Sequence, residues 1–183
     1  NKKNAFKDIR QLLLDNKITD FADLFRLLYD EVDGYTGHIK GHRDGREAIH
    51  FDTEQGEFHA SKLFRRPLIM ANRTSDDYHT LALRQFNAKD RLGFIEWYLE
   101  NKVDKVGLVI IDGIADLCLD VNSNTESTAV VQKLMEWSAR FKCHIVTVIH
   151  SNFGSDKPTG HLGSTLEKKA ECQIQLERNT KHN

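Results

Sequence analysis

The residues best suited to chemistry in this chain are polar side chains that directly follow apolar runs. The runs at 48–51, 106–111 and 144–149 are rich in β-branched and aliphatic residues. Such runs are typical of strands buried on both faces. The polar residues that follow them are Asp52 and Glu54, Asp112 and Gly113, and His150. In α/β proteins, the carboxyl ends of strands are where ligands bind, so these residues predict one polar site.

Each of these side chains suits one step of nucleotide chemistry. Asp112 could hold a magnesium ion through water, and Gly113 would let a phosphate approach the backbone. His150 could sense a terminal phosphate. Each position also has a structural interpretation: Asp112 could cap a helix, Asp52 and its neighbours could cap the helix that begins near residue 57, and His150 could form a simple strand-end hydrogen bond.

A glycine-containing loop at 154–163 follows His150 and carries Lys157 and His161. Glycine permits conformations that other residues avoid, so such a loop can become ordered around a second ligand. The loop therefore predicts a second contact beside the strand ends.

The elements that would position these residues alternate between strand and helix. We expect strands at 48–51, 80–84, 106–111, 144–149 and 172–176. We expect helices at 57–66 (ending before Pro67), 87–100, from the capping box at 123–126 onward, and at 162–169. This alternation predicts an α/β fold with a mostly parallel sheet and right-handed crossovers.

The first 45 residues differ from the rest and form a separate predicted unit. Two amphipathic helices are expected in residues 4–15 and 20–32, followed by a loop with four glycines at 34–45. His38 and His42 have the spacing of a helical metal site, but the flanking glycines argue against a helix there. Residues 1–45 are thus predicted as an N-terminal helical segment, and 46–183 as the main domain.

Composition limits the class of protein. The 183 residues are 39% apolar and 29% charged with a formal net charge of −1, which predicts a globular domain and neither demands nor excludes nucleic acid. The three cysteines, Cys118, Cys143 and Cys172, lie in apolar or strand-like runs, and they predict reduced core thiols and a cytoplasmic setting. No apolar run approaches the roughly 20 residues of a membrane span, so no membrane contact is expected.

From about Ile49 to Glu177 the chain resembles the RecA-like ATPases of the helicase and replication-protein group, most closely the version in Bacteroidetes mobile elements and phage-like genomes. The matching motifs are DTEQ at 52–55, the Walker B-like LVIIDGIADL at 108–117, VIHSN at 148–152 and TGHLGSTLEKKAE at 159–171. They occur in the expected order and spacing.

The resemblance implies a RecA-like three-layer sandwich that uses ATP and Mg²⁺ and acts as a homo-oligomer. Asp112 would be the Walker B acid that binds Mg²⁺ through water. Glu54 would position and deprotonate the attacking water, and His150 would link the γ-phosphate to a DNA-binding loop. The loop at 153–163, with Lys157 and His161, would contact DNA, most simply a single strand. Such a domain would couple ATP hydrolysis to replication or mobilisation of a mobile element.

The family's phosphate-binding motif, G-x-x-x-x-G-K-[S/T], does not occur in these 183 residues. The P-loop could lie outside this sequence, the chain could be a degenerate ATPase, or another chain could complete the site. A substitution by Lys40 or Arg43 is the least favoured explanation. Without the P-loop strand, the sheet itself would be incomplete. The alternative functions are a non-catalytic module that recruits a replication partner through its N-terminal helices, and a nucleotide-independent DNA-binding protein.

Overall fold

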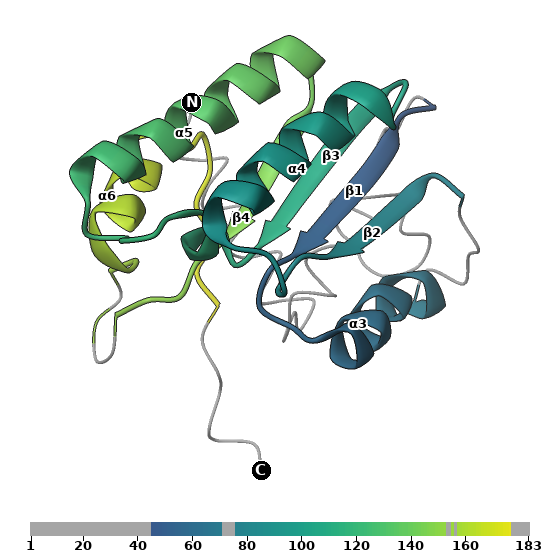
Figure 1. Ribbon diagram of the computed structural model, residues 1–183, viewed down its shortest axis with the longest axis horizontal. Coiled ribbons are helices and arrows are strands. Elements are labelled where there is room, and N and C mark those ends of the chain that lie inside the picture. Colours follow the sequence, from purple (N-terminus) through teal and green to yellow (C-terminus); the bar gives the residue numbers. More distant parts are fainter. Residues whose placement is uncertain (1–44, 71–75, 153–154, 156, 177–183) are drawn as a thin grey trace, which may run out of the picture.

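The structure is a computed structural model, and it describes residues 45–70, 76–152, 155 and 157–176 (Figure 1). The predicted N-terminal helices, the glycine-rich loop, the His38 and His42 pair and the two proposed substitutes for the P-loop lysine all lie outside the described residues. The described part begins just before the first strand.

Four parallel strands form one sheet. They are β1 (Glu47–Asp52), β2 (Tyr78–Ala82), β3 (Val106–Asp112) and β4 (His144–Val148). Their order is β2-β1-β3-β4, so β1 and β3 are central and β2 and β4 are the outer strands. The predicted parallel sheet is confirmed.

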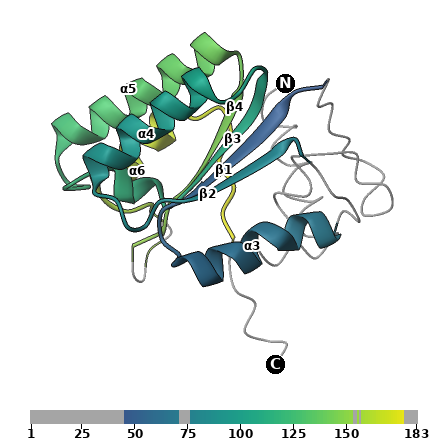
Figure 2. The ribbon, with the colours of Figure 1, turned by 45° about the vertical axis from the view of Figure 1, so that its right-hand side comes forward.

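Helices cover both faces of this sheet. They are α3 (Glu57–Met70), α4 (Ala88–Asn101), α5 (Asn124–Phe141) and α6 (Gly160–Lys169), with a short 3-10 helix η1 (Ile114–Leu117) after β3. Figure 2 shows α3 on one face and α4 and α5 on the other, and α6 packs beside α5. The three layers confirm the predicted α/β sandwich.

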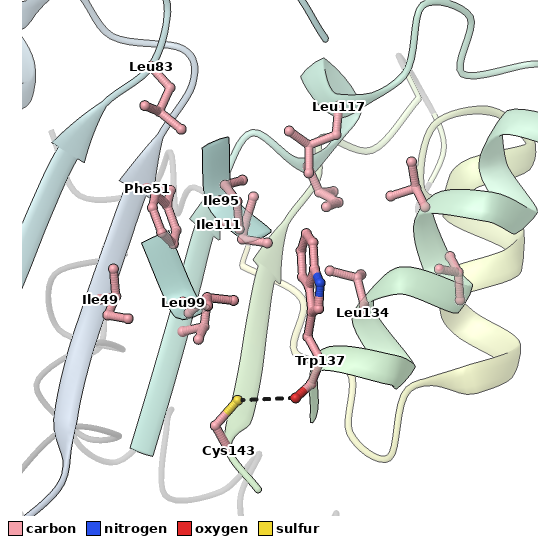
Figure 3. Close-up of a cluster of buried hydrophobic side chains, with 14 of the residues drawn as sticks. Ile49, Phe51, Leu83, Ile95, Leu99, Ile111, Leu117, Leu134, Trp137 and Cys143 are labelled. Atoms are coloured by element: carbon pink, nitrogen blue, oxygen red, sulfur yellow. Dashed lines mark hydrogen bonds between the residues drawn. The ribbon is translucent and has the colours of Figure 1, made fainter. Parts of the chain in front are cut away.

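The larger core lies between the sheet and the α4–α5 layer (Figure 3). Alternate residues of β1 and β3, such as Ile49 and Ile111, point into it because successive strand residues face opposite sides. Trp137 of α5 is fully buried at its centre. On the other face, Ala48, Tyr78, Leu108 and Ile110 form a smaller cluster beneath α3. The even-numbered residues of β1 and β3 therefore face α3.

Local sequence signals set the helix starts. Asn87 caps α4 by accepting a hydrogen bond from the Asp90 amide at 3.0 Å, and Ser123 caps α5 through the Glu126 amide at 3.3 Å. The predicted capping box is only half formed, because the Glu126 carboxylate accepts from the amides of Leu119 and Asp120 instead. These caps fix where the crossover helices leave the carboxyl edge of the sheet.

Three sequence predictions are corrected. Helix α3 continues through Pro67 to Met70, because Pro67 is buried and the neighbouring Leu68 packs against the smaller core, which stabilises the last turn. Residues 172–176 form no strand, since they pair with no neighbouring strand in the described chain. Cys172 in this segment is consequently exposed, whereas Cys143 is buried and Cys118 is intermediate.

None of the helices described here is long and apolar enough to cross a membrane. The outer strand β4 is distinctive in another respect: its residues 145–148 are only partly buried, although they are apolar or β-branched. Strand β3, with a neighbour on each side, is almost entirely buried.

Candidate functional site

The candidate residues gather where β1, β3 and β4 end. The sheet register places Asp52 beside Asp112, and Asp112 beside Val148, two residues before His150. Asp52 and Asp112 are both even-numbered positions of their strands and face the α3 side. The predicted convergence of strand ends therefore brings Asp52, Glu54, Asp112 and His150 to one edge.

Asp52 shapes the turn that follows β1. Its Oδ1 accepts hydrogen bonds from the amides of Glu54 at 2.9 Å and Gln55 at 2.7 Å, which is the geometry of an Asx turn. Its Oδ2 is buried and has no hydrogen-bond partner among the described residues. Burial raises the pKa of Asp52, although the two amides oppose that rise. The structure thus supports the turn-forming interpretation of Asp52, and the second carboxylate oxygen is shielded from solvent.

Asp112 is the most perturbed acid of the site. Burial, together with the negative charges of Asp52 and Glu54, raises its pKa to about 7, while His150 lowers it. A carboxyl group beside other carboxylates resists ionisation because like charges repel. Its side chain is still 17% exposed, so it can be reached from solvent. A cation bound at this point would relieve the repulsion.

Glu54 and His150 face one another across the carboxyl edge. His150 Nε2 lies 3.4 Å from Glu54 Oε2, with 80% of the His150 side chain and 32% of the Glu54 side chain exposed. Residues from the β1 turn and the β4 end are therefore linked over a sequence distance of 96 residues. This contact places a carboxylate and an imidazole together at the open side of the site.

Thr53 ties the ends of β1 and β3 together, a role that no sequence pattern indicated. Its hydroxyl lies 3.0 Å from the Asp112 carbonyl, 2.8 Å from the Gly113 carbonyl and 3.0 Å from Asp116 Oδ2. Its amide donates to the Asp112 carbonyl at 2.9 Å. Asp116 enters this network from η1. The network fixes the backbone that carries both Asp112 and Glu54.

Gly113 is needed for backbone geometry and packing. Its φ is +94°, a left-handed conformation that favours glycine. A Cβ there would collide with Thr53 Oγ1 and lie 2.6 Å from Glu54 Cγ. The turn that follows β1 therefore occupies the position that a side chain at residue 113 would need. The predicted role of Gly113 in admitting a phosphate remains a prediction.

His50 is a further buried residue of the site that sequence reasoning missed. Its Nδ1 lies 2.9 Å from the Tyr78 hydroxyl, its Nε2 lies 3.9 Å from Asp112 Oδ2, and Phe64 of α3 packs edge-on against its ring at 5.0 Å. Burial lowers its pKa to about 3, so the ring is neutral at physiological pH. The period-2 alternation could have found it, because His50 precedes Asp52 by two residues.

Lys157 and His161 do not join this cluster. The loop after β4 folds back on itself: the Asn152 amide donates to the Lys157 carbonyl at 2.8 Å, and the Thr159 hydroxyl donates to the His150 carbonyl at 2.7 Å. Lys157 is exposed in this loop, and His161 is exposed in the first turn of α6. In the described part of the chain, no hydrogen bond or ion pair joins either side chain to the site carboxylates. Their predicted contact with nucleic acid remains a prediction.

No group of three or more His, Cys, Asp or Glu side chains within the described ranges is placed to hold a metal ion. Magnesium commonly binds through one or two carboxylates and keeps several waters, with substrate phosphates completing its shell. The partly exposed carboxylate of Asp112 fits that mode of binding.

A parallel α/β sandwich with acidic strand ends is an architecture that ATPase-type domains share with other α/β proteins. The comparison with known families narrows the class: the family model described as AAA domain matches residues 37–156, about two thirds of the chain. The chain therefore belongs to the AAA domain family, whose members in general use a nucleotide and Mg²⁺. No curated protein and no solved structure matches it.

Proposed function

We propose that the chain is an ATPase domain in which Asp112 holds Mg²⁺ through water and Glu54 positions and deprotonates the attacking water. The observation that carries this proposal is the convergence of Glu54, Asp112 and His150 from three strands, with the Asp112 pKa raised to about 7 by burial and neighbouring carboxylates. When bound, magnesium would neutralise phosphate charge.

The chain's own residues divide the remaining work. Glu54 is partly exposed and can accept a proton, and His150 beside it can contact a terminal phosphate. Thr53 holds the backbone of Asp112 and Gly113 in place, which is the preorganisation that phosphoryl transfer requires. The neutral His50 ring lies beside Asp112, with its Nε2 3.9 Å from Asp112 Oδ2.

The phosphates still need a binding element, and we infer that it docks beside β4. Among the described residues this outer strand pairs with β3 alone, and its apolar or β-branched residues 145–148 remain partly exposed. A further strand at this edge would bring its following loop next to His150 and Asp112. It would come from outside the described residues or from a neighbouring copy in a homo-oligomer.

The finer role that we propose is coupling of ATP hydrolysis to single-stranded DNA during replication or mobilisation of a mobile element. It is supported by the likeness of the motifs at 52–55, 108–117, 148–152 and 159–171 to the replication ATPases. The folded-back loop after β4 starts at His150, so movement of a bound phosphate could be transmitted to Lys157 and His161.

The proposal predicts Mg²⁺-dependent ATP hydrolysis that single-stranded DNA stimulates. Glu54→Gln should lower the rate about 100-fold or more while ATP binding persists, because the amide cannot accept the proton of the attacking water. Asp112→Ala should abolish both hydrolysis and the Mg²⁺ dependence of ATP binding. Glu57→Gln is the matched control, because Glu57 is an exposed acid of the first α3 turn.

Isothermal titration calorimetry with ATP and Mg²⁺ decides whether the chain binds nucleotide. The absence of binding by the full chain and by its oligomer would contradict the enzymatic proposal. It would favour the alternative, a non-catalytic AAA-domain module that recruits a replication partner, for which the lack of a G-x-x-x-x-G-K-[S/T] motif in the 183 residues is the supporting observation.

A further inference from the structure

A basic cavity of about 440 Å³ lies at the amino end of the sheet, opposite the acidic site. Its charged lining residues are Arg46, Lys105, Arg140, Lys142 and Asp104. They come from three separate connections: the segment before β1, the loop from α4 to β3, and the turn from α5 to β4. Figure 1 shows the C-terminal ends of α4 and α5 above the starts of β1 and β3. None of these residues belongs to the candidate ATPase site.

Arg46 is one of the residues that line this cavity, and its side chain is held in place. Its Nη1 donates to the Lys142 carbonyl at 2.8 Å. Its side chain crosses Gly107, where a Cβ would lie only 2.7 Å from Arg46 Cβ and 3.3 Å from Arg46 Cδ. The sheet register shifts at this point between Glu47 and Ala48. The register shift at the start of β1 and the close contact with Gly107 thus hold the Arg46 side chain in one position.

The positive charges of the cavity are only partly neutralised. Arg140 pairs with Glu100 at 2.7 Å, and Asp104 contributes one negative charge to the lining. Within the described part of the chain, Arg46, Lys105 and Lys142 form no ion pair with a carboxylate. A local positive field therefore remains on a chain whose formal net charge is −1.

Helix stabilisation explains only some of these cations. Basic residues favour the C-terminal end of a helix because of the helix dipole, which accounts for Arg140 and Lys142 at the end of α5. It does not account for Arg46 and Lys105, which precede strands. Their presence in the same cavity gives it a positive surface that would attract a negatively charged ligand.

We propose that this basic cavity binds the phosphodiester backbone of single-stranded nucleic acid. A single small phosphate is usually held by converging backbone amides at a helix N-terminus, whereas two helix C-termini meet here. Cations spread around a cavity suit a chain of phosphates instead. One aromatic ring, that of Phe141, also lines the cavity, with the Arg140 guanidinium 5.2 Å from its centroid.

Fluorescence anisotropy with a labelled 20-nucleotide oligo(dT) tests the proposal. The full chain is titrated without nucleotide or Mg²⁺, so the result does not depend on ATPase activity. The double variant Lys105→Ala, Lys142→Gly should weaken binding about tenfold. It should also lower the slope of log affinity against log salt concentration by about 1.4, because each of the two lost phosphate contacts on a single strand contributes about 0.7. Glycine is chosen at 142 because its φ is +52°.

Lys89→Ala is the matched control, since Lys89 is an exposed lysine near the opposite end of α4. It should leave the oligo(dT) affinity unchanged. The single variant Lys105→Ala, at an exposed position, should keep the wild-type melting temperature and still weaken binding about threefold. Equal affinity of the double variant and the wild type would overturn the proposal. Displacement of the oligonucleotide by dTMP at the same nucleotide concentration would also overturn it, because it would indicate a small-phosphate site.

Discussion

The two ends of the parallel sheet differ in charge, burial and bonding, although β1 and β3 contribute to both. At the carboxyl end, Asp52 is fully buried and Asp112 is partly buried, and a network centred on Thr53 ties the strand ends together. At the amino end, Lys105 and Lys142 are exposed, Arg46 donates a hydrogen bond to the Lys142 carbonyl, and Arg140 pairs with Glu100. The formal net charge of −1 does not reveal that acidic and basic residues gather at opposite ends of the sheet.

The difference shows where the fold tolerates a cost in stability. Burying neighbouring carboxylates is unfavourable, because each loses hydration and repels the others. The carboxyl end keeps them in spite of this cost, as is typical of chemical sites. Exposed cations cost little, and they attract polyanions over a distance. This contrast agrees with our proposals of catalysis at the rigid acidic end and of nucleic-acid binding at the open basic end.

The largest effect is expected from Gly113→Ala at the rigid end. The substitution forces a residue with a side chain to adopt a φ of +94° and places its Cβ against Thr53 and Glu54. Backbone strain and overpacking together should lower the free energy of unfolding by about 4 kcal/mol. Urea unfolding monitored by circular dichroism measures this change.

Gly93→Ala is the control for that experiment. Gly93 lies within α4, and a Cβ there would meet nothing within 4 Å. Alanine should therefore raise the stability by up to about 1 kcal/mol through helix propensity. If Gly113→Ala proved as stable as the wild type, the carboxyl end would not be rigid. The proposed contrast between the two ends would then be contradicted.

Asp112→Asn is expected to stabilise the protein at neutral and alkaline pH. The folded-state pKa of about 7 lies above the ordinary value of 3.8, so the folded chain binds more protons between these values. Wild-type stability should thus fall as the pH rises from about 4 to 7. The neutral asparagine avoids this loss, so the variant should gain on the order of 3 kcal/mol at pH 8 and almost nothing at pH 4.

Unfolding titrations at both pH values check this prediction, with Asp76→Asn as the exposed control. A pH-independent difference between Asp112→Asn and the wild type would mean that Asp112 ionises normally. The same variant should lose Mg²⁺-dependent ATP binding. Stability and function would then respond in opposite directions to one substitution.

Sequence patterns predicted the acidic end well. Apolar runs located β1, β3 and β4, and parallel strands end at one edge, so Glu54, Asp112 and His150 could be grouped before any contact was known. The Thr53 and Asp116 contacts could not be predicted, because they depend on the path of η1. The alternating residues 172–176 suggested a strand, but alternation does not reveal whether a neighbouring strand is present to pair with.

The basic end could not be predicted from sequence. Arg46, Lys105 and Arg140 lie far apart in the chain, and each is an ordinary surface residue in its own segment. Only the return of three connections to one side of the sheet brings them together. A site made of isolated residues from turns leaves no periodic signal, unlike one at the ends of apolar strands.

The smallest effect is expected from Gly107→Ala at the basic end. The added Cβ would lie 2.7 Å from Arg46 Cβ, but φ at 107 is not in the left-handed region, and the start of β1 can shift. We expect a loss of about 1 kcal/mol from crowding. Displacement of Arg46 should also weaken oligo(dT) binding about threefold, measured by anisotropy, with ATP binding unchanged. A loss of ATP binding would mean that β1 and β3 transmit strain along their length, so that the two ends would form one coupled unit.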